Sequence, residues 1–293
     1  MEKYIISDIS MEFNGIKLFR IKNVLTGELG GWIENENNLS QKGSAWIYND
    51  AKVFQDAVVS GNAKIKENAI VSGQCHIFDN AIVSGNARVF GQAKISGSTY
   101  LDEQVSISGN TQISDLAIIS GFARVTGYSK ISGSAFVSNQ SQIIDSTIKD
   151  CAKVVNDAVV NISTIEGNAI ILENAKIDGG AFVTDNVIIS GHVRLNGEVK
   201  ISGDAMLQQE AIILGQSVIF DNATVSGKAI VRGNAQIYEK ASLIENIIIK
   251  DNAKIYGQAV ISGHAMVEDN AQVCGSAVIS GFTKVSGSEC IIE

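Results

Sequence analysis

Three histidines are the residues of this chain best suited to acid–base chemistry. His192 and His264 both stand directly before a small residue, 72 residues apart. In the repeat described below this separation corresponds to four coils, or roughly 19 Å, so the two side chains cannot bind one metal ion or one substrate atom. His76 follows a position that the repeat turns inward, and therefore points outward. None of the three has a carboxylate at a spacing that would orient it as a general base.

We therefore predict three solvated histidines and no catalytic residue, and retain the alternative that His192 or His264 acts in a groove between subunits. The four cysteines, at positions 75, 151, 274 and 290, form no C-x-x-C or other metal-binding spacing, so no metal site is predicted. Phosphate-binding glycine loops are absent, and no serine stands beside a base that would activate it.

The dominant feature of the sequence is an aliphatic residue at every sixth position. From Ile165 to Ile291 the series has no exception, and a second series runs from Ile47 to Ile143. A small residue usually stands four places after each aliphatic one, as in Ile261 to Ala265. Neither a helix nor an ordinary strand has this period, whereas a repeat architecture does. The sequence therefore predicts a solenoid.

Three such units would make a triangular coil of about 18 residues, with one short strand on each side and strands ~4.8 Å apart between coils. The aliphatic residues would form ladders inside, beside a row of small residues. Asparagines stand before many alanines, and we interpret them as the corner residues with positive φ: Asn62, Asn80, Asn86, Asn168, Asn222, Asn234 and Asn252. Proline is absent, which suits stacked parallel strands whose interior N–H groups must all donate.

Two irregular regions limit the repeat. Residues 1–44 do not follow it; two short strands joined at Asn14-Gly15 predict a hairpin-like cap that covers the first coil. The six-residue spacing shortens to five between Ile143 and Ile148 and again between Val160 and Ile165. We expect tightened corners near 147–163 within one domain spanning 45–293; two solenoid blocks joined at a bend are the alternative. After Cys290 the chain has no helix that would cover the last coil.

Outward side chains should fall into rows 18 residues apart, because strand residues alternate between the two sides of a sheet. The first face carries enough apolar residues to exceed what a monomer usually exposes, which predicts a subunit or partner interface. Its residues are Trp46, Ile82, Tyr100, Ile118, Phe136, Ile170, Ile188 and Met206. The second face starts with Lys52, Arg88 and Arg124 and becomes apolar at Ile212, Ile230, Ile248 and Met266, whereas the third stays largely polar.

A further column, Phe220, Tyr238 and Tyr256, lies at corners one coil apart. Stacked aromatic rings there would stabilise the edge of the solenoid by ~0.5–1.5 kcal/mol per pair. We favour this structural role; a platform for carbohydrate or another ligand is the alternative. Replacing Tyr238 and Tyr256 would separate the two, because only a platform loses a ligand together with stability.

Composition excludes several classes of function. A net charge of −8 argues against a nucleic-acid or anionic-membrane surface. The N-terminus lacks a basic-then-apolar signal pattern, and no stretch of 18 apolar residues is present. We therefore expect a cytoplasmic protein that contacts neither nucleic acid nor membrane.

The pattern aliphatic-x-x-x-small-x, often with Gly or Asn in the turn, resembles the hexapeptide repeat of left-handed parallel β-helix proteins and covers residues 45–293. The segment from Gly30 to Phe54 is similar to the entry motif of the YdcK-like proteins of bacteria and phages. This resemblance implies an all-β fold, a left-handed coil and, in the acyltransferases, acetyl-CoA as cofactor. Fold alone does not fix function. We predict a non-catalytic, self-associating structural module without a cofactor, with a CoA-dependent acyltransferase as the alternative.

Overall fold

The computed structural model describes residues 2–293, which form two compact units. The first unit ends at Asp145 and the second begins at Ser146. The coils of both units consist of parallel two- or three-residue strands, and the described residues contain no α-helix. The predicted all-β solenoid with 18-residue coils is confirmed. The left-handed sense of the coil stays a prediction.

The first unit begins with a cap of three strands. β1 (Tyr4–Phe13) and β2 (Ile16–Asn23) pair antiparallel around Asn14 and Gly15, which both take positive φ. β3 (Leu29–Ile33) is antiparallel to β2 and parallel to β5 (Lys52–Val53), so it connects the hairpin to the coils. A short 3₁₀ helix, η1 (Glu36–Asn38), follows. The predicted hairpin is confirmed.

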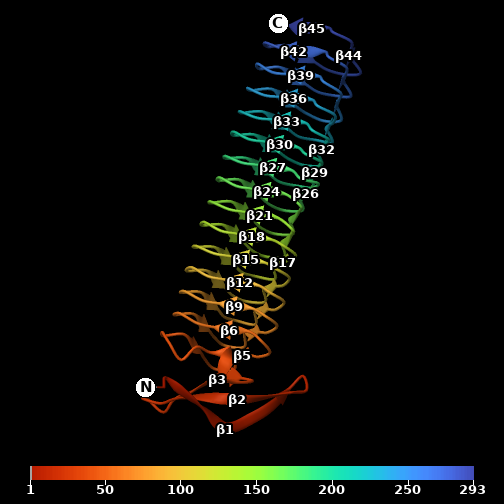
Figure 1. The fold of residues 1–293 in the computed structure, drawn as a ribbon. Helices are drawn as coiled ribbons and strands as arrows, with labels where there is room; N and C mark the ends of the chain where they lie inside the picture. The colour runs from red at the N-terminus through yellow and green to blue at the C-terminus, as the bar shows by residue number, and fades with distance from the viewer. Residues whose placement is uncertain (1) are drawn as a thin grey trace. The chain divides into compact units, whose positions relative to one another are not determined.

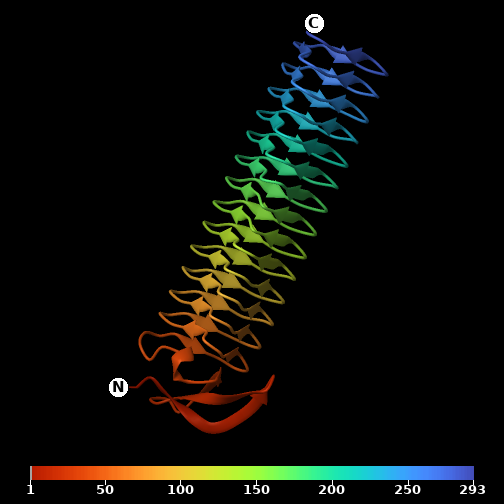
Figure 2. The same cartoon turned by 45° about the vertical axis from the view of Figure 1, so that its right-hand side comes forward.

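The cap lies against the first coil (Figure 2). Buried apolar side chains fill the contact between them. Leu18, Trp32 and Phe54 form one cluster, and Phe13 packs against it edge-on to Phe54 at 5.9 Å. The buried Asn38 side chain donates to the carbonyl oxygens of Gln55 and Ala57, so its polar atoms are satisfied. The cap therefore removes an edge that would otherwise be free to pair with another chain.

The coils of the first unit present three faces. The first face contains β4 (Trp46–Ile47), β7 (Lys64–Ile65), β10 (Ile82–Val83), β13 (Tyr100–Leu101), β16 (Ile118–Ile119) and β19 (Phe136–Val137). The second contains β5, β8 (Ile70–Val71), β11 (Arg88–Val89), β14 (Ser106–Ile107), β17 (Arg124–Thr126) and β20 (Gln142–Ile144). The third, whose labels stack in Figure 1, contains β6 (Val58–Val59), β9 (His76–Ile77), β12 (Lys94–Ile95), β15 (Gln112–Ile113) and β18 (Lys130–Ile131).

The second unit is built in the same way. Its first face contains β22 (Lys153–Val154), β25 (Ile170–Ile171), β28 (Ile188–Ile189), β31 (Met206–Leu207), β34 (Thr224–Val225), β37 (Ser242–Leu243), β40 (Val260–Ile261) and β43 (Val278–Ile279). Its second contains β23 (Val159–Asn161), β26 (Lys176–Asp178), β29 (Arg194–Asn196), β32 (Ile212–Leu214), β35 (Ile230–Val231), β38 (Ile248–Ile249), β41 (Met266–Val267) and β44 (Lys284–Val285). Its third contains β21 (Thr147–Ile148), β24 (Thr164–Ile165), β27 (Phe182–Val183), β30 (Lys200–Ile201), β33 (Val218–Ile219), β36 (Gln236–Ile237), β39 (Lys254–Ile255), β42 (Gln272–Cys274) and β45 (Cys290–Ile292).

The register confirms the length of the coil. Ile82 pairs with Tyr100, 18 residues on, and this offset recurs through both units. At the start of the second unit Thr147 pairs with Thr164, so the short step between Val160 and Ile165 closes a coil one residue early without inserting a loop. In nearly every strand the aliphatic residue is buried and the residue before it faces solvent.

The corner asparagines are the point at which the sequence-based prediction is wrong. Residues 62, 80, 86, 168, 222, 234 and 252 do not have positive φ; the residue before each of them does, for example Gly61 and Asp79. Most of these asparagine side chains instead bond from coil to coil, as Asn62 Nδ2 does to Asn80 Oδ1 at 3.1 Å. The amide side chain of each such asparagine forms a hydrogen bond with a residue of a neighbouring coil. The residue before the asparagine has the positive φ, a conformation that glycine adopts readily.

Two buried threonines differ in one hydrogen bond and give a test of the interior. Thr111 Oγ1 donates to the Ser108 carbonyl oxygen at 2.6 Å, whereas Thr99 Oγ1 has no partner among the described residues. Thr99→Val should therefore raise the free energy of unfolding by about 1 kcal/mol, and Thr111→Val should lower it by about 1 kcal/mol. Urea denaturation of both variants measures this. Changes of the same sign would contradict the hydrogen-bond assignment.

Candidate functional site

The first face of the first unit carries a continuous row of apolar side chains. Ile82, Tyr100, Ile118 and Phe136 occupy four neighbouring strands in direct register. Tyr100 is 38% exposed and Ile118 is 41% exposed, whereas the other two are half-buried. Trp46 lies at the cap end of the same face, where Tyr4 packs edge-on against it at 6.3 Å. The structure thus places the predicted row of this unit on one sheet; its role as an interface stays a prediction.

Tyr100 is held in place by hydrogen bonds. Its hydroxyl donates to Asp102 Oδ2 at 2.7 Å, and the buried Ser84 hydroxyl donates to Asp102 Oδ1 at 2.8 Å. The hydrogen bond with Ser84 lowers the pKa of Tyr100, but the Asp102 carboxylate and burial outweigh it, so the pKa lies above its usual value. A pinned aromatic ring between two isoleucines is a pre-ordered contact, which loses little side-chain entropy on binding.

The second unit has a shorter apolar row on its first face. Ile170, Ile188 and Met206 are half-buried on adjacent strands β25, β28 and β31. Thr224 and Ser242 follow on the next strands, so the row ends in polar side chains.

His192 has a carboxylate neighbour that the sequence analysis did not foresee. Together with Arg194, Glu210 and Ile212 it lines a hollow of about 340 Å³ on the second unit. Glu210 lies one coil further along the chain at the same corner position, and its Oε2 lies 3.8 Å from Lys228 Nζ. Stacking of the coils brings residues 18 apart together, so Glu210 lines the same hollow as His192; that no carboxylate orients His192 as a general base stays a prediction. No hydrogen bond joins the two side chains in the described structure.

The other two histidines have different surroundings. His264 lies at a corner of the coils, where its ring stacks on the Phe282 ring with centroids 4.9 Å apart. His76 is exposed on the third face between Val58 and Lys94. Both positions agree with the predicted surface location.

The corner aromatic column is continuous. Phe220 and Tyr238 stack with centroids 4.8 Å apart, and Tyr238 and Tyr256 with centroids 5.0 Å apart; the rings are nearly parallel. The hydrogen bond between Tyr256 and the Cys274 thiol, followed by partial burial, raises the pKa of Tyr256 to about 12. The tyrosine hydroxyl therefore stays protonated at neutral pH. Whether the column also serves as a ligand platform stays a prediction.

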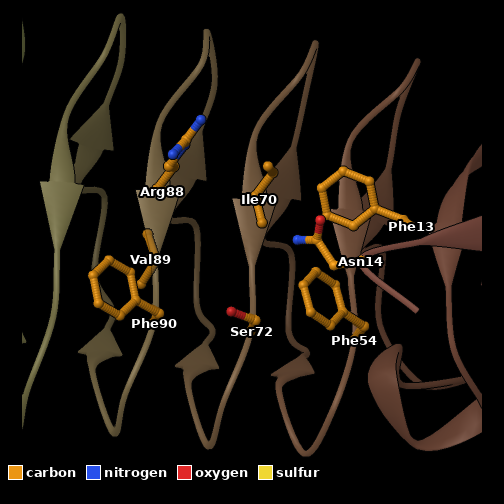
Figure 3. A pocket seen from close by; sticks show the side chains of 8 residues that line it. All are labelled: Phe13, Asn14, Phe54, Ile70, Ser72, Arg88, Val89 and Phe90. Atoms are coloured by element: carbon orange, nitrogen blue, oxygen red, sulfur yellow. The ribbon is translucent and has the colours of Figure 1, made fainter. Parts of the chain in front are cut away.

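The second face of the first unit contains a groove that the sequence analysis did not identify as a site. Two hollows of about 500 and 510 Å³ share Arg88 and Phe90 in their lining. The hollow of about 510 Å³ also shares Phe122 and Arg124 with a third hollow of about 400 Å³. Figure 3 shows the end nearest the cap, where Phe13 and Asn14 of the hairpin turn lie beside Phe54. The groove therefore starts at the cap and follows the stack of coils.

Charge distinguishes this groove from the rest of the chain. Its lining contains two arginines and no acidic residue, although the chain has a net charge of −8. Neither the Arg88 nor the Arg124 guanidinium has an ion-pair or hydrogen-bond partner within residues 2–293. Phe90 and Phe122 are 44% and 56% exposed. The row of arginines was visible in the sequence, but the phenylalanines lie at corners and the cap residues lie outside the repeat.

No group of three or more His, Cys, Asp or Glu side chains within residues 2–293 is arranged to hold a metal ion. Burial raises the pKa of the Cys75 thiol to about 11, which makes it unreactive at neutral pH. Among the same residues, none of the helical structure reaches the length and apolarity that crossing a membrane requires.

Comparison with known proteins gives two partial matches. Residues 259–275 match the family model described as the YdcK beta solenoid repeat. A stretch of 48 residues is 44% identical to the "Uncharacterized acetyltransferase YdcK" of Escherichia coli strain K12. This stretch makes up 16% of the chain and covers about 15% of that relative's length. The chain is therefore a β-solenoid in which residues 259–275 are similar to the YdcK type of repeat, and it matches only a small part of the length of this curated relative.

Proposed function

We propose that this chain is a non-catalytic β-solenoid that self-associates through the apolar row on its first face. One observation carries the proposal: Ile82, Tyr100, Ile118 and Phe136 lie on four adjacent strands of one sheet. A continuous row of apolar side chains on a rigid support is typical of contacts between copies of a chain. Tyr100, fixed by Asp102 and flanked by isoleucines, has the properties of an interface anchor.

The proposal predicts the state of association. The purified chain should elute as a dimer or larger species in size-exclusion chromatography with light scattering. Ile118→Lys should shift it to monomer, because a charge in the centre of an apolar contact is desolvated without a partner. Gln112→Lys is the matched control, since Gln112 is an exposed outward residue of the neighbouring strand β15 on the third face.

Two outcomes decide against self-association through this face. A monomeric wild-type chain across the micromolar range would end the proposal. Equal effects of Ile118→Lys and Gln112→Lys would show that added charge acts anywhere on the surface, so the first face would lose its assigned role.

An acyltransferase is the second candidate function. The supporting observation is that His192 shares its hollow with Glu210, a pair of the kind that general-base catalysis uses. The relative from Escherichia coli carries the words "uncharacterized acetyltransferase" in its name. Acetyl-CoA would be the cofactor. Calorimetric titration with acetyl-CoA tests this candidate. Micromolar binding that is lost in His192→Ala supports an acyltransferase, whereas a titration without binding heat contradicts it.

A further inference from the structure

The groove on the second face of the first unit is independent of the first face and of His192. It is lined by side chains from successive coils, as Figure 3 shows for the end nearest the cap. A small compact ligand would fill only a fraction of such a surface. An extended chain lying along the stack of coils would contact all of it.

The positive charge of the groove favours an anionic ligand. Arg88 and Arg124 are the charged residues of the lining, and both guanidinium groups are unpaired within the described residues. A guanidinium binds a carboxylate or sulfate with two parallel hydrogen bonds, which gives orientation as well as affinity. Unpaired arginines in a chain of net charge −8 therefore indicate a specific anionic ligand more strongly than a general basic surface would.

The distance between the two arginines indicates which kind of anion fits. Arg88 pairs with Ser106 and Ser106 pairs with Arg124, so the two arginines stand two coils apart, about 10 Å. This is comparable to the length of a disaccharide unit. Each arginine has an exposed phenylalanine two residues away, Phe90 or Phe122. The coil between them offers Gln104, Ser106 and Ser108, which can donate to and accept from hydroxyl groups.

We propose that this groove binds an acidic oligosaccharide in which charged and neutral sugars alternate. The arginines bind the carboxylates of alternate sugars, the phenylalanine rings cover apolar sugar faces, and the middle coil bonds the hydroxyls of the neutral sugar. A single nucleic-acid strand fits less well, because it carries a phosphate at every nucleotide and is bound along a continuous basic track.

A calorimetric titration with a hyaluronan hexasaccharide, an alternating acidic and neutral sugar chain, tests the proposal. The full chain should bind it with an affinity that falls as salt is raised. The double variant Arg88→Ala/Arg124→Ala should bind at least about tenfold more weakly, and Phe90→Ala and Phe122→Ala several-fold more weakly. Thermal unfolding of these variants should stay unchanged, because all four side chains are exposed at the surface.

Controls address the alternatives. Arg232→Ala, at an exposed arginine of the second unit, should leave the affinity unchanged, and neutral chitohexaose should bind far more weakly than hyaluronan. Ile118→Lys should also keep the affinity, which separates this proposal from self-association. Absence of hyaluronan binding, an equal loss in Arg232→Ala, or tighter binding of an oligothymidylate through Arg88 and Arg124 would each overturn the proposal.

Discussion

Ile249→Ala is expected to lower the free energy of unfolding by about 2–5 kcal/mol, because it removes buried methyl groups and leaves a cavity in a stack that cannot close over it. Ile249 is fully buried in β38, between the strands that carry Val231 and Val267. The backbone on both sides is fixed by hydrogen bonds between coils, such as Lys250 N–H to the Val267 carbonyl oxygen at 3.0 Å. Urea denaturation followed by circular dichroism measures the loss.

The neighbouring residue provides the control. Ile248 belongs to the same strand but faces outward, where it is half-buried between Ile230 and Met266. Ile248→Ala should cost less than about 1 kcal/mol, since the position stays in contact with water. In a solenoid each coil contacts only its neighbours, so hydrogen exchange in Ile249→Ala should accelerate first at Arg232 and Lys250. Equal costs at 248 and 249 would contradict the assignment of inward and outward positions.

The sequence was sufficient for the fold because one spacing determines most of it. A period of six places every Ile, Val and Leu of the series inside, and with three sides per coil it determines which residues stack 18 apart. For this reason the 18-residue offset alone predicted two rows of side chains. They are the row Ile82, Tyr100, Ile118 and the column Phe220, Tyr238, Tyr256. The hairpin followed from its Asn-Gly turn.

Corner geometry was less predictable. Asn, Asp and Gly all tolerate positive φ, so composition could not tell which of two adjacent turn residues has it; the structure assigns it to Gly61 and not to Asn62. The His192–Glu210 proximity follows from the 18-residue offset. The sequence alone gives this offset, but only the structure shows that the two side chains line one hollow.

The groove was missed for another reason. Arg88 and Arg124 were visible as outward residues of one face, but a row of arginines on a strand face is also typical of a solvated surface. What makes the groove is the cap, whose Phe13 and Asn14 close one end, and the corner phenylalanines beside the arginines. The cap lies outside the repeat, so no periodicity could place it. Sites at the junction of a repeat and a non-repeat segment require coordinates.

That junction also contains a glycine beside which there is no room for a side chain. Gly31 lies in β3, and a Cβ there would collide with the Ile47 side chain and come within 2.6 Å of the Ala51 carbonyl oxygen. This oxygen accepts the N–H of Trp32 at 2.9 Å, which joins the cap to the first coil. Gly31→Ala should therefore displace β3 and lower the free energy of unfolding by about 1–3 kcal/mol. Leu29→Ala, an exposed residue of the same strand, should cost less than about 0.5 kcal/mol.

Tryptophan fluorescence gives a local readout of this change, because both tryptophans of the chain lie at the junction. Trp32 is buried in the cluster with Leu18 and Phe54, and Trp46 packs against Tyr4. In Gly31→Ala we expect a red-shifted emission at urea concentrations that leave the circular dichroism of the coils intact. The freed edge of the first coil should also raise the tendency to aggregate, since an uncovered parallel strand accepts other chains. A variant with unchanged emission and unchanged stability would mean that the close approach of β3 to β5 is not needed to hold the cap.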